Sequence, residues 1–187
     1  MGEVIKDEKT YNPPPQDNPW LKFEEGTTTI RLLSHSYHFK SHYVKSENKS
    51  YDCTGFVETC KWCQGANLPR QRWAYAILVR GKEESLIKVM EVGWSIFGTI
   101  LNLSKDEDYG DPRGYDLKIT KTGTGLDTSY TVIPGKETDF TEEEMKLLEP
   151  KELGNIEKAT GYLLSFYKQE TDKPDTPKEE EEEEIPF

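Results

Sequence analysis

The segment from residue 45 to residue 69 limits most strongly what this chain can fold into. It holds all three cysteines of the 187-residue chain, but it has very few aliphatic residues. A segment so poor in apolar side chains cannot fold by burial alone and needs another source of stability. An odd number of cysteines argues against a framework of disulfides. The sequence therefore predicts a lobe that is organised by a bound metal ion.

The cysteine spacing in this lobe is typical of a zinc site. Cys60 and Cys63 form a Cys-x2-Cys pair, and Cys53 lies seven residues before it. Three thiolates and one imidazole make a closed tetrahedral zinc set. The alternatives are three unrelated cysteines or a redox pair, but no helix start follows Cys60, as a redox motif requires. Spacing alone leaves three histidines as candidates for the fourth ligand: His35, His38 and His42.

A zinc ion closed by four protein ligands has no position left for a substrate. The chain also has no His-Glu-x-x-His motif, no phosphate-binding glycine loop and no zinc-deaminase pattern. We therefore expect one structural Zn²⁺ and no enzymatic activity. A zinc hydrolase or nuclease is the least favoured alternative.

Alternating apolar residues on both sides of the lobe predict a mainly β fold with a few short helices. Strands are expected at six places: residues 28–33, 37–44, 73–79, 86–92, 115–120 and 129–133. A helix fits residues 95–103, and two more are expected to begin at the capping-box pair Thr141 and Glu144 and near Asn155. This order suits a β-barrel of the OB type, with a zinc subdomain at about residues 40–69 inserted between two strands.

Composition divides the chain into three parts. Residues 1–19 are rich in proline and predict an extended arm, residues 20–168 form the core, and residues 169–187 form a disordered acidic tail. The net charge of −11 is unevenly placed, because residues 20–136 carry a net charge of +2. The acidic whole-chain balance therefore does not exclude a local surface that binds nucleic acid.

Aromatic and basic residues alternate through and around the predicted lobe. Single-stranded DNA needs cations for its phosphates and flat rings for its bases. Each ring could instead fill the core, although Tyr43, Tyr51 and Trp62 lie in sequence that offers little to bury them. Trp94 and Phe97, flanked by apolar residues, are expected in the core. The candidate DNA contacts are Lys40, Tyr43, Lys45, Tyr51, Lys61, Trp62, Arg70, Arg72, Trp73 and Tyr75.

The tail carries six glutamates, Glu179 to Glu184, followed by Ile185, Pro186 and Phe187. A run of like charge stays solvated, so the apolar tip has nothing to bury against in its own domain. We expect the tip to insert into a basic pocket with an apolar floor on a partner, which would also bind the terminal carboxylate. The ending resembles the tail tip of bacterial single-stranded DNA-binding proteins, which recruits replication and repair enzymes. The alternative is a tail that only improves solubility.

The core resembles the single-stranded DNA-binding proteins of T-even phages. The resemblance covers about residues 20–135 and rests on the first strand, the order His42, Cys53, Cys60-x2-Cys63, and the basic-aromatic strand after the lobe. It implies an OB-fold with a zinc subdomain, a basic aromatic cleft for single-stranded DNA, and His42 as the fourth zinc ligand. Residues 1–19 differ from that family's basic helical segment, because they are Pro-rich and net negative.

These observations predict a non-catalytic, sequence-tolerant single-stranded DNA-binding protein. It would protect and organise DNA and recruit replication, recombination or repair proteins through its tail. The sequence has no signal peptide and no apolar run that could span a membrane, so we expect a cytoplasmic protein, in the host cell if it is phage-encoded. The alternatives are a zinc-containing adaptor without DNA binding and a single-stranded RNA binder.

Overall fold

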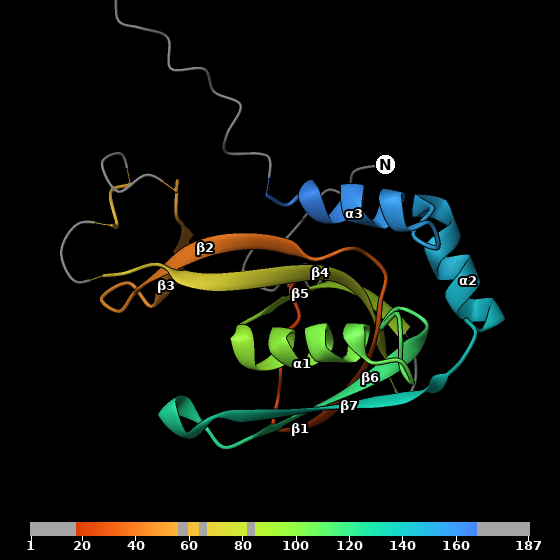
Figure 1. The fold of residues 1–187 in the computed structure, drawn as a ribbon. Helices are drawn as coiled ribbons and strands as arrows, with labels where there is room; N and C mark the ends of the chain where they lie inside the picture. The colour runs from red at the N-terminus through yellow and green to blue at the C-terminus, as the bar shows by residue number, and fades with distance from the viewer. Residues whose placement is uncertain (1–17, 56–59, 64–66, 82–84, 168–187) are drawn as a thin grey trace, which may run out of the picture.

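Antiparallel strands form the framework of the fold (Figure 1). The computed structural model of the protein describes residues 18–55, 60–63, 67–81 and 85–167. These residues contain one seven-stranded sheet in the order β3-β2-β4-β1-β6-β7, with β5 paired to β4. The strands are β1 (Gly26–Leu32), β2 (Tyr37–Val44), β3 (Lys49–Asp52), β4 (Arg70–Arg80), β5 (Ser85–Val92), β6 (Tyr115–Thr122) and β7 (Ser129–Glu137). The prediction of a mainly β fold is confirmed.

Short helices accompany the sheet, and two of them begin where the sequence predicted. They are α1 (Trp94–Lys105), α2 (Glu142–Leu148) and α3 (Ile156–Leu164), with short 3-10 turns η1 (Gly125–Asp127) and η2 (Glu149–Lys151). At the start of α2, the Glu144 amide donates to the Thr141 hydroxyl (3.2 Å) and the Thr141 amide to the Glu144 carboxylate (2.9 Å). At α3 the Asn155 side chain accepts from two amides. These contacts satisfy helix N–H groups that would otherwise lack partners.

Strand β4 is the centre of the sheet. One edge of β4 pairs with β5, while β2 and β1 share its other edge end to end. The chain bends between β2 and β1, where the Ala76 amide donates to the Ser34 hydroxyl (2.9 Å). Strand β1 also pairs with β6 along its other edge, and the sheet curves around α1 (Figure 1).

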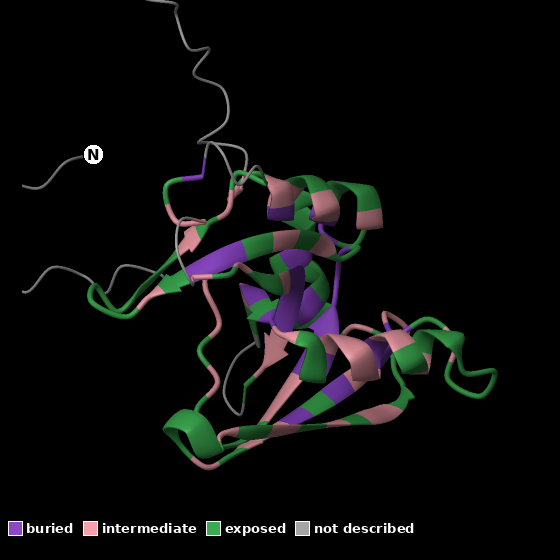
Figure 2. Ribbon diagram, turned by 60° about the vertical axis from the view of Figure 1, so that its left-hand side comes forward, coloured by how far each residue is buried: buried purple, intermediate pink, exposed green. Residues whose placement is uncertain are grey.

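Both faces of β4 are buried, and they belong to different cores. Trp73, Tyr75 and Ile77 pack with the buried side of α1. Between them, Ala74 and Ala76 point the other way, into a second core with buried residues of the α2–α3 region. Alternate residues of the predicted strand at 73–79 therefore belong to different cores. Figure 2 shows the buried positions concentrated in the strands and the adjoining faces of the helices.

A network of buried ion pairs fastens α2 to the sheet. Arg31, only 2% exposed, donates to Asp116 (3.0 Å), and Arg80 also donates to Asp116 (2.7 Å). Arg80 also donates to the buried carboxylate of Glu144 in α2 (3.1 Å). Paired charges of this kind are costly to separate, because an unpaired partner would stay buried. The network therefore fixes the position of α2.

In the described part of the chain, no helix is both long and apolar enough to cross a bilayer. The predictions for the N-terminal arm and the acidic tail fall mostly on residues 1–17 and 168–187, which lie outside the described residues.

Candidate metal centre and the adjoining aromatic face

A β-hairpin brings the predicted metal ligands together. In the β2–β3 pairing His42 lies opposite Tyr51, and Cys53 follows β3 directly. The Cys53 amide donates to the Lys40 carbonyl (2.8 Å), which holds the chain beside β2. Cys60 and Cys63 approach from the connection to β4 as a tight turn, with the Cys63 amide donating to the Cys60 carbonyl (3.1 Å).

The side chains of His42, Cys53, Cys60 and Cys63 form one cluster. Their candidate ligand atoms all lie within 4.8 Å of one another. The sulfurs of Cys53 and Cys63 are 3.6 Å apart, and Nε2 of His42 lies 3.5 Å from the Cys60 sulfur and 3.4 Å from the Cys63 sulfur. All three cysteines are free thiols. This cluster could hold a metal ion.

The structure separates the three histidines. His42 is fully buried, and its Nδ1 lies 3.0 Å from the Asn67 carbonyl, where it donates a hydrogen bond. In a neutral imidazole this leaves the lone pair on Nε2, which faces the cysteines. His38 is instead bonded to Gln71 on the exposed surface, and His35 lies beside Glu157. Only His42 among them has its ring in the cluster.

The thiols of the cluster influence each other's ionisation. Burial opposes ionisation of Cys60, but hydrogen bonds from the backbone of Trp62, Thr54 and Cys63 outweigh it and lower the pKa of that thiol to about 6. At Cys63, burial and the neighbouring thiols of Cys53 and Cys60 raise the pKa to about 12. One thiolate forms easily and makes the next harder to form. A divalent cation would favour the thiolate form of all three.

A line of rings and cations runs from this cluster along one face of the sheet. Cross-strand partners share a face, and side chains alternate along each strand. The pairs His42–Tyr51 and His38–Trp73 therefore place Tyr51, Lys40, His38 and Trp73 on the same side. We call this side of β2, β3 and β4, together with Trp62 and the start of α1, the aromatic face.

At the cluster end of the aromatic face, Trp62 stacks on Tyr51. The ring centroids are 4.6 Å apart and the planes differ by 21°. The ammonium group of Lys61 lies 4.6 Å from the Trp62 ring centroid, a cation–π contact. The sequence offers few apolar side chains here, so these residues pack on one another beside the metal cluster.

At the other end, rings of β2, β4 and α1 form a ladder. His38 contacts Trp73 (5.3 Å), Trp73 stacks on Phe97 (4.2 Å, 4° between planes), and Phe97 contacts Trp94 (5.9 Å). The prediction that Trp94 lies in the core is wrong, because it is 63% exposed. The helical period of the sequence already indicates this exposure. Ile96, Ile100 and Leu103 define the core side of α1, and Trp94 projects away from that side.

The remaining candidate DNA contacts occupy several environments. Tyr43 is exposed at the hairpin, where its hydroxyl donates to Asn48 (2.6 Å), and Lys45 is exposed beside it. Arg70 and Arg72 start β4 on the face opposite Trp73, although the Arg72 guanidinium reaches toward Gly93 at the start of α1. Tyr75 is a core residue, and burial raises the pKa of its hydroxyl to about 12. Its ring is not available to a ligand in this structure.

No protein-family model, curated protein or solved structure matches this chain.

Proposed function

We propose that the protein binds single-stranded DNA without catalysing a reaction, and that its aromatic face is the binding surface. The observation that carries the proposal is the continuity of this face from Trp62 and Tyr51 through Lys40 to the exposed Trp94, whose ring contacts the buried Trp73 (5.7 Å). Flat rings accept bases of any sequence, and the flanking lysines suit phosphates. A duplex hides its bases, so the same surface favours single strands.

We propose that the Cys3His cluster binds one structural Zn²⁺. Zinc–sulfur bonds of about 2.3 Å and zinc–nitrogen bonds of about 2.0–2.1 Å imply tetrahedral edges of about 3.8 Å between sulfurs and about 3.6 Å from sulfur to nitrogen. Three separations in the cluster fit these edges: 3.6 Å between the sulfurs of Cys53 and Cys63, and 3.4–3.5 Å from Nε2 of His42 to the sulfurs of Cys63 and Cys60. Soft thiolates with one imidazole in a tetrahedral set favour zinc over hard cations.

The role of the ion would be to hold the hairpin and the Cys60–Cys63 turn together. His42 would supply Nε2 while the Asn67 carbonyl keeps its ring in place. The cluster lies beside Tyr51, Lys61 and Trp62, so it would fix one end of the aromatic face. With four protein ligands there is no position for a substrate, in accord with a protein that binds rather than reacts.

We also propose that the sheet is a partly open barrel of the OB type. The support is the order of pairing, β5-β4-β1-β6-β7, with α1 connecting β5 to β6 and the metal lobe inserted between β2 and β4. OB-folds present a curved face that binds oligonucleotides. T-even-type phage proteins, which the sequence resembles, would then share this architecture.

The acidic tail is proposed to recruit replication, recombination or repair proteins through Ile185, Pro186 and Phe187. Its support is the sequence alone: an apolar tip after six glutamates suits a basic pocket with an apolar floor. We propose a cytoplasmic setting, because the three free thiols of the metal cluster suit a reducing compartment.

Titration of tryptophan fluorescence with oligonucleotides tests the DNA proposal. Single-stranded DNA of unrelated sequences should bind with similar affinity and more tightly than duplex DNA. The slope of log affinity against log salt should be about −0.7 for each phosphate contacted. Equal affinity for duplex DNA would overturn the proposal, tighter binding of RNA would reassign the ligand, and no binding would favour a zinc-containing adaptor.

A further inference from the structure

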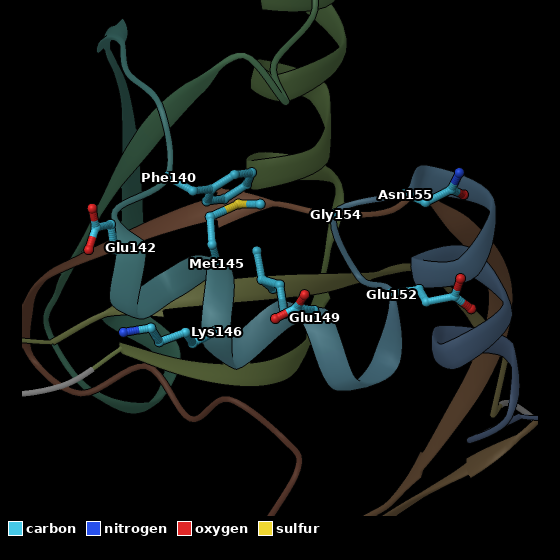
Figure 3. Close-up of a pocket in the computed structure, with 9 residues that line it drawn as sticks. Phe140, Glu142, Met145, Lys146, Glu149, Glu152, Gly154 and Asn155 are labelled. Atoms are coloured by element: carbon cyan, nitrogen blue, oxygen red, sulfur yellow. The ribbon is translucent and has the colours of Figure 1, made fainter.

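An apolar groove lies between α2 and the start of α3, far along the chain from the metal cluster. Its volume is about 540 Å³, and its apolar lining consists of Phe140, Met145 and Leu148. In Figure 3 the Phe140 ring and the Met145 side chain lie together above α2, facing the turn that carries Gly154. This volume lies within the range typical of ligand pockets.

The groove has a fixed floor and one adaptable side chain. Leu148 is fully buried in the second core, and Phe140 packs against that core. The Arg31 guanidinium lies 5.4 Å from the centroid of the Phe140 ring, so the buried ion network supports this ring. Met145 is 51% exposed. An exposed methionine can adjust its shape to an apolar side chain placed against it.

The rim of the groove is acidic. Glu142, Glu149 and Glu152 line it, and Lys146 is the lining cation. Glu152 pairs with Lys158 (2.9 Å), whereas among the described residues no ion pair joins Glu142 or Glu149. Residues 137–152 carry a net charge of −5. The groove therefore combines an apolar floor with carboxylates that are available to an incoming cation.

We propose that this groove docks a segment of a partner protein that carries a bulky apolar anchor flanked by lysine or arginine. The anchor would lie on Phe140 and Met145, and the flanking cations would meet Glu142 and Glu149. Charge complementarity selects this occupant. Phosphates of a nucleic acid and the glutamates of the chain's own tail would be repelled by the rim, and a symmetric contact between two copies would oppose acid to acid.

The groove and the aromatic face lie at opposite ends of the molecule. In Figure 1 the β2–β3 hairpin is at the left and α2 is at the right. A partner in the groove would thus leave the aromatic face open. This inference does not depend on DNA binding, and a variant of the groove can be tested separately from a variant of the face.

Selection of displayed random peptides on the full-length chain tests the proposal. We expect enrichment of peptides with one or two large apolar residues next to lysine or arginine. Met145→Glu should weaken these peptides by at least about tenfold, as loss of a central anchor does. The matched control is Leu147→Glu, which adds the same charge to an exposed residue of α2 outside the groove. It should change affinity by no more than about twofold.

Further variants distinguish the other occupants. The double variant Glu142→Lys, Glu149→Lys should weaken the selected peptides, while circular dichroism and DNA affinity stay those of the wild type. The proposal is overturned if no peptide is selected, if selected peptides bind Met145→Glu as tightly as wild type, or if they are acidic. A dimer in sedimentation that Met145→Glu abolishes would assign the groove to a second copy and overturn it too.

Discussion

At the scale of single residues, the surroundings of a side chain decide what it can do. Sequence spacing left three histidines as candidates for the fourth metal ligand. The structure distinguishes them, because only His42 has its ring in the cysteine cluster. The Asn67 carbonyl then sets its tautomer. In the same way, exposure separates Trp94 from Tyr75: one ring is open to a ligand and the other belongs to the core.

Metal content tests the choice of histidine. Purified protein should contain one zinc per chain, and His42→Ala should lose it, whereas His38→Ala should keep it, because His38 bonds to Gln71 outside the cluster. Cys60→Ser should destabilise the lobe strongly, since zinc binding in structural sites is worth about 10–16 kcal/mol. Mass spectrometry under native conditions measures the metal. Full zinc content in His42→Ala would show that the ligand set is wrong.

Trp94 gives a second residue-scale prediction. Trp94→Ala should weaken binding of single-stranded DNA by about 1–3 kcal/mol, the usual contribution of one stacked base. Stability should hardly change, because the ring is 63% exposed. Tyr109→Ala is a matched control, since it removes another exposed ring (46%) away from the aromatic face. Fluorescence anisotropy measures the DNA affinity of both variants. Equal losses of affinity would show that Trp94 is not part of the proposed surface.

At the scale of elements, β4 joins the two halves of the molecule. Trp73, Tyr75 and Ile77 face α1, while the second core is faced by Ala74, Ala76 and Leu78, all 0% exposed. The small side chains let the C-terminal helices approach the sheet closely. Phe166 and Tyr167, which follow α3, pack on Trp20 with ring centroids 5.7 and 5.8 Å away, so both ends of the described chain cover this face.

Ala76→Leu tests this packing. A larger side chain has no room between β4 and the helices and should lower the free energy of unfolding by about 1–3 kcal/mol. Thr131→Leu places the same side chain at an exposed position of β7 and should stay within about 0.5 kcal/mol of wild type. Urea denaturation measures both variants. An unchanged midpoint for Ala76→Leu would mean that the helices pack less closely than described.

A pH dependence follows from the contact between Tyr167 and Glu91. Loss of solvation raises the pKa of Glu91 first of all, and the nearby Asp52 adds to this, while the hydrogen bond from Tyr167 (2.7 Å) and Arg72 oppose it. The folded state therefore holds this proton more tightly than the unfolded state. Protonated Glu91 therefore stabilises the folded state at low pH. This stabilisation is lost as the pH rises from the ordinary carboxyl pKa through the raised pKa of Glu91.

Glu91→Gln should remove this part of the pH dependence. Glutamine can still accept the hydrogen bond from Tyr167, and burial raises the pKa of that tyrosine, so its hydroxyl stays protonated. At neutral pH the variant should be at least as stable as wild type. Thermal melts across the acidic to neutral range provide the test. A wild-type melting temperature that tracks the variant at every pH would contradict the prediction.

At the scale of the whole molecule, charge is separated. Residues 40–82 carry eight lysines and arginines against three acids, the region around α2 is acidic, and residues 173–187 add a net charge of −5. Such an arrangement keeps the aromatic face attractive to phosphates in a chain that is acidic overall. It also gives the proposed partner contacts, at the groove and at the tail, the opposite charge from the proposed DNA surface.

Removal of residues 173–187 should therefore tighten DNA binding. The effect should be largest at low salt, where screening is weakest, because the glutamates compete with DNA for the cations of the aromatic face. Phe187→Ala keeps all six glutamates, so DNA affinity should hold while binding of tail partners falls. Anisotropy and pull-down from host extract measure the two effects. If wild type and Phe187→Ala recover the same partners, the tail serves only to improve solubility and the recruitment proposal is wrong.

The sequence by itself determined the features that depend on neighbours along the chain. Alternation predicted the strands, the pair Thr141 and Glu144 predicted the start of α2, and Asn155 predicted that of α3. These are short-range effects of side-chain period and of hydrogen bonding to unpaired amides. The Cys-x2-Cys pair with Cys53 likewise indicated a metal lobe, because ligand spacing is also a property of the chain itself.

Tertiary structure decided what depends on residues distant in sequence. The ring of His42 reaches the cysteines because the β2–β3 hairpin folds it against a turn some twenty residues later. Arg31 and Arg80 pair with Asp116 and Glu144 from four different elements. Trp94 is exposed because the core of α1 is on its other side, and the groove at Met145 exists only where α2 meets α3. Pattern along the chain limits such contacts, but only packing in three dimensions selects among them.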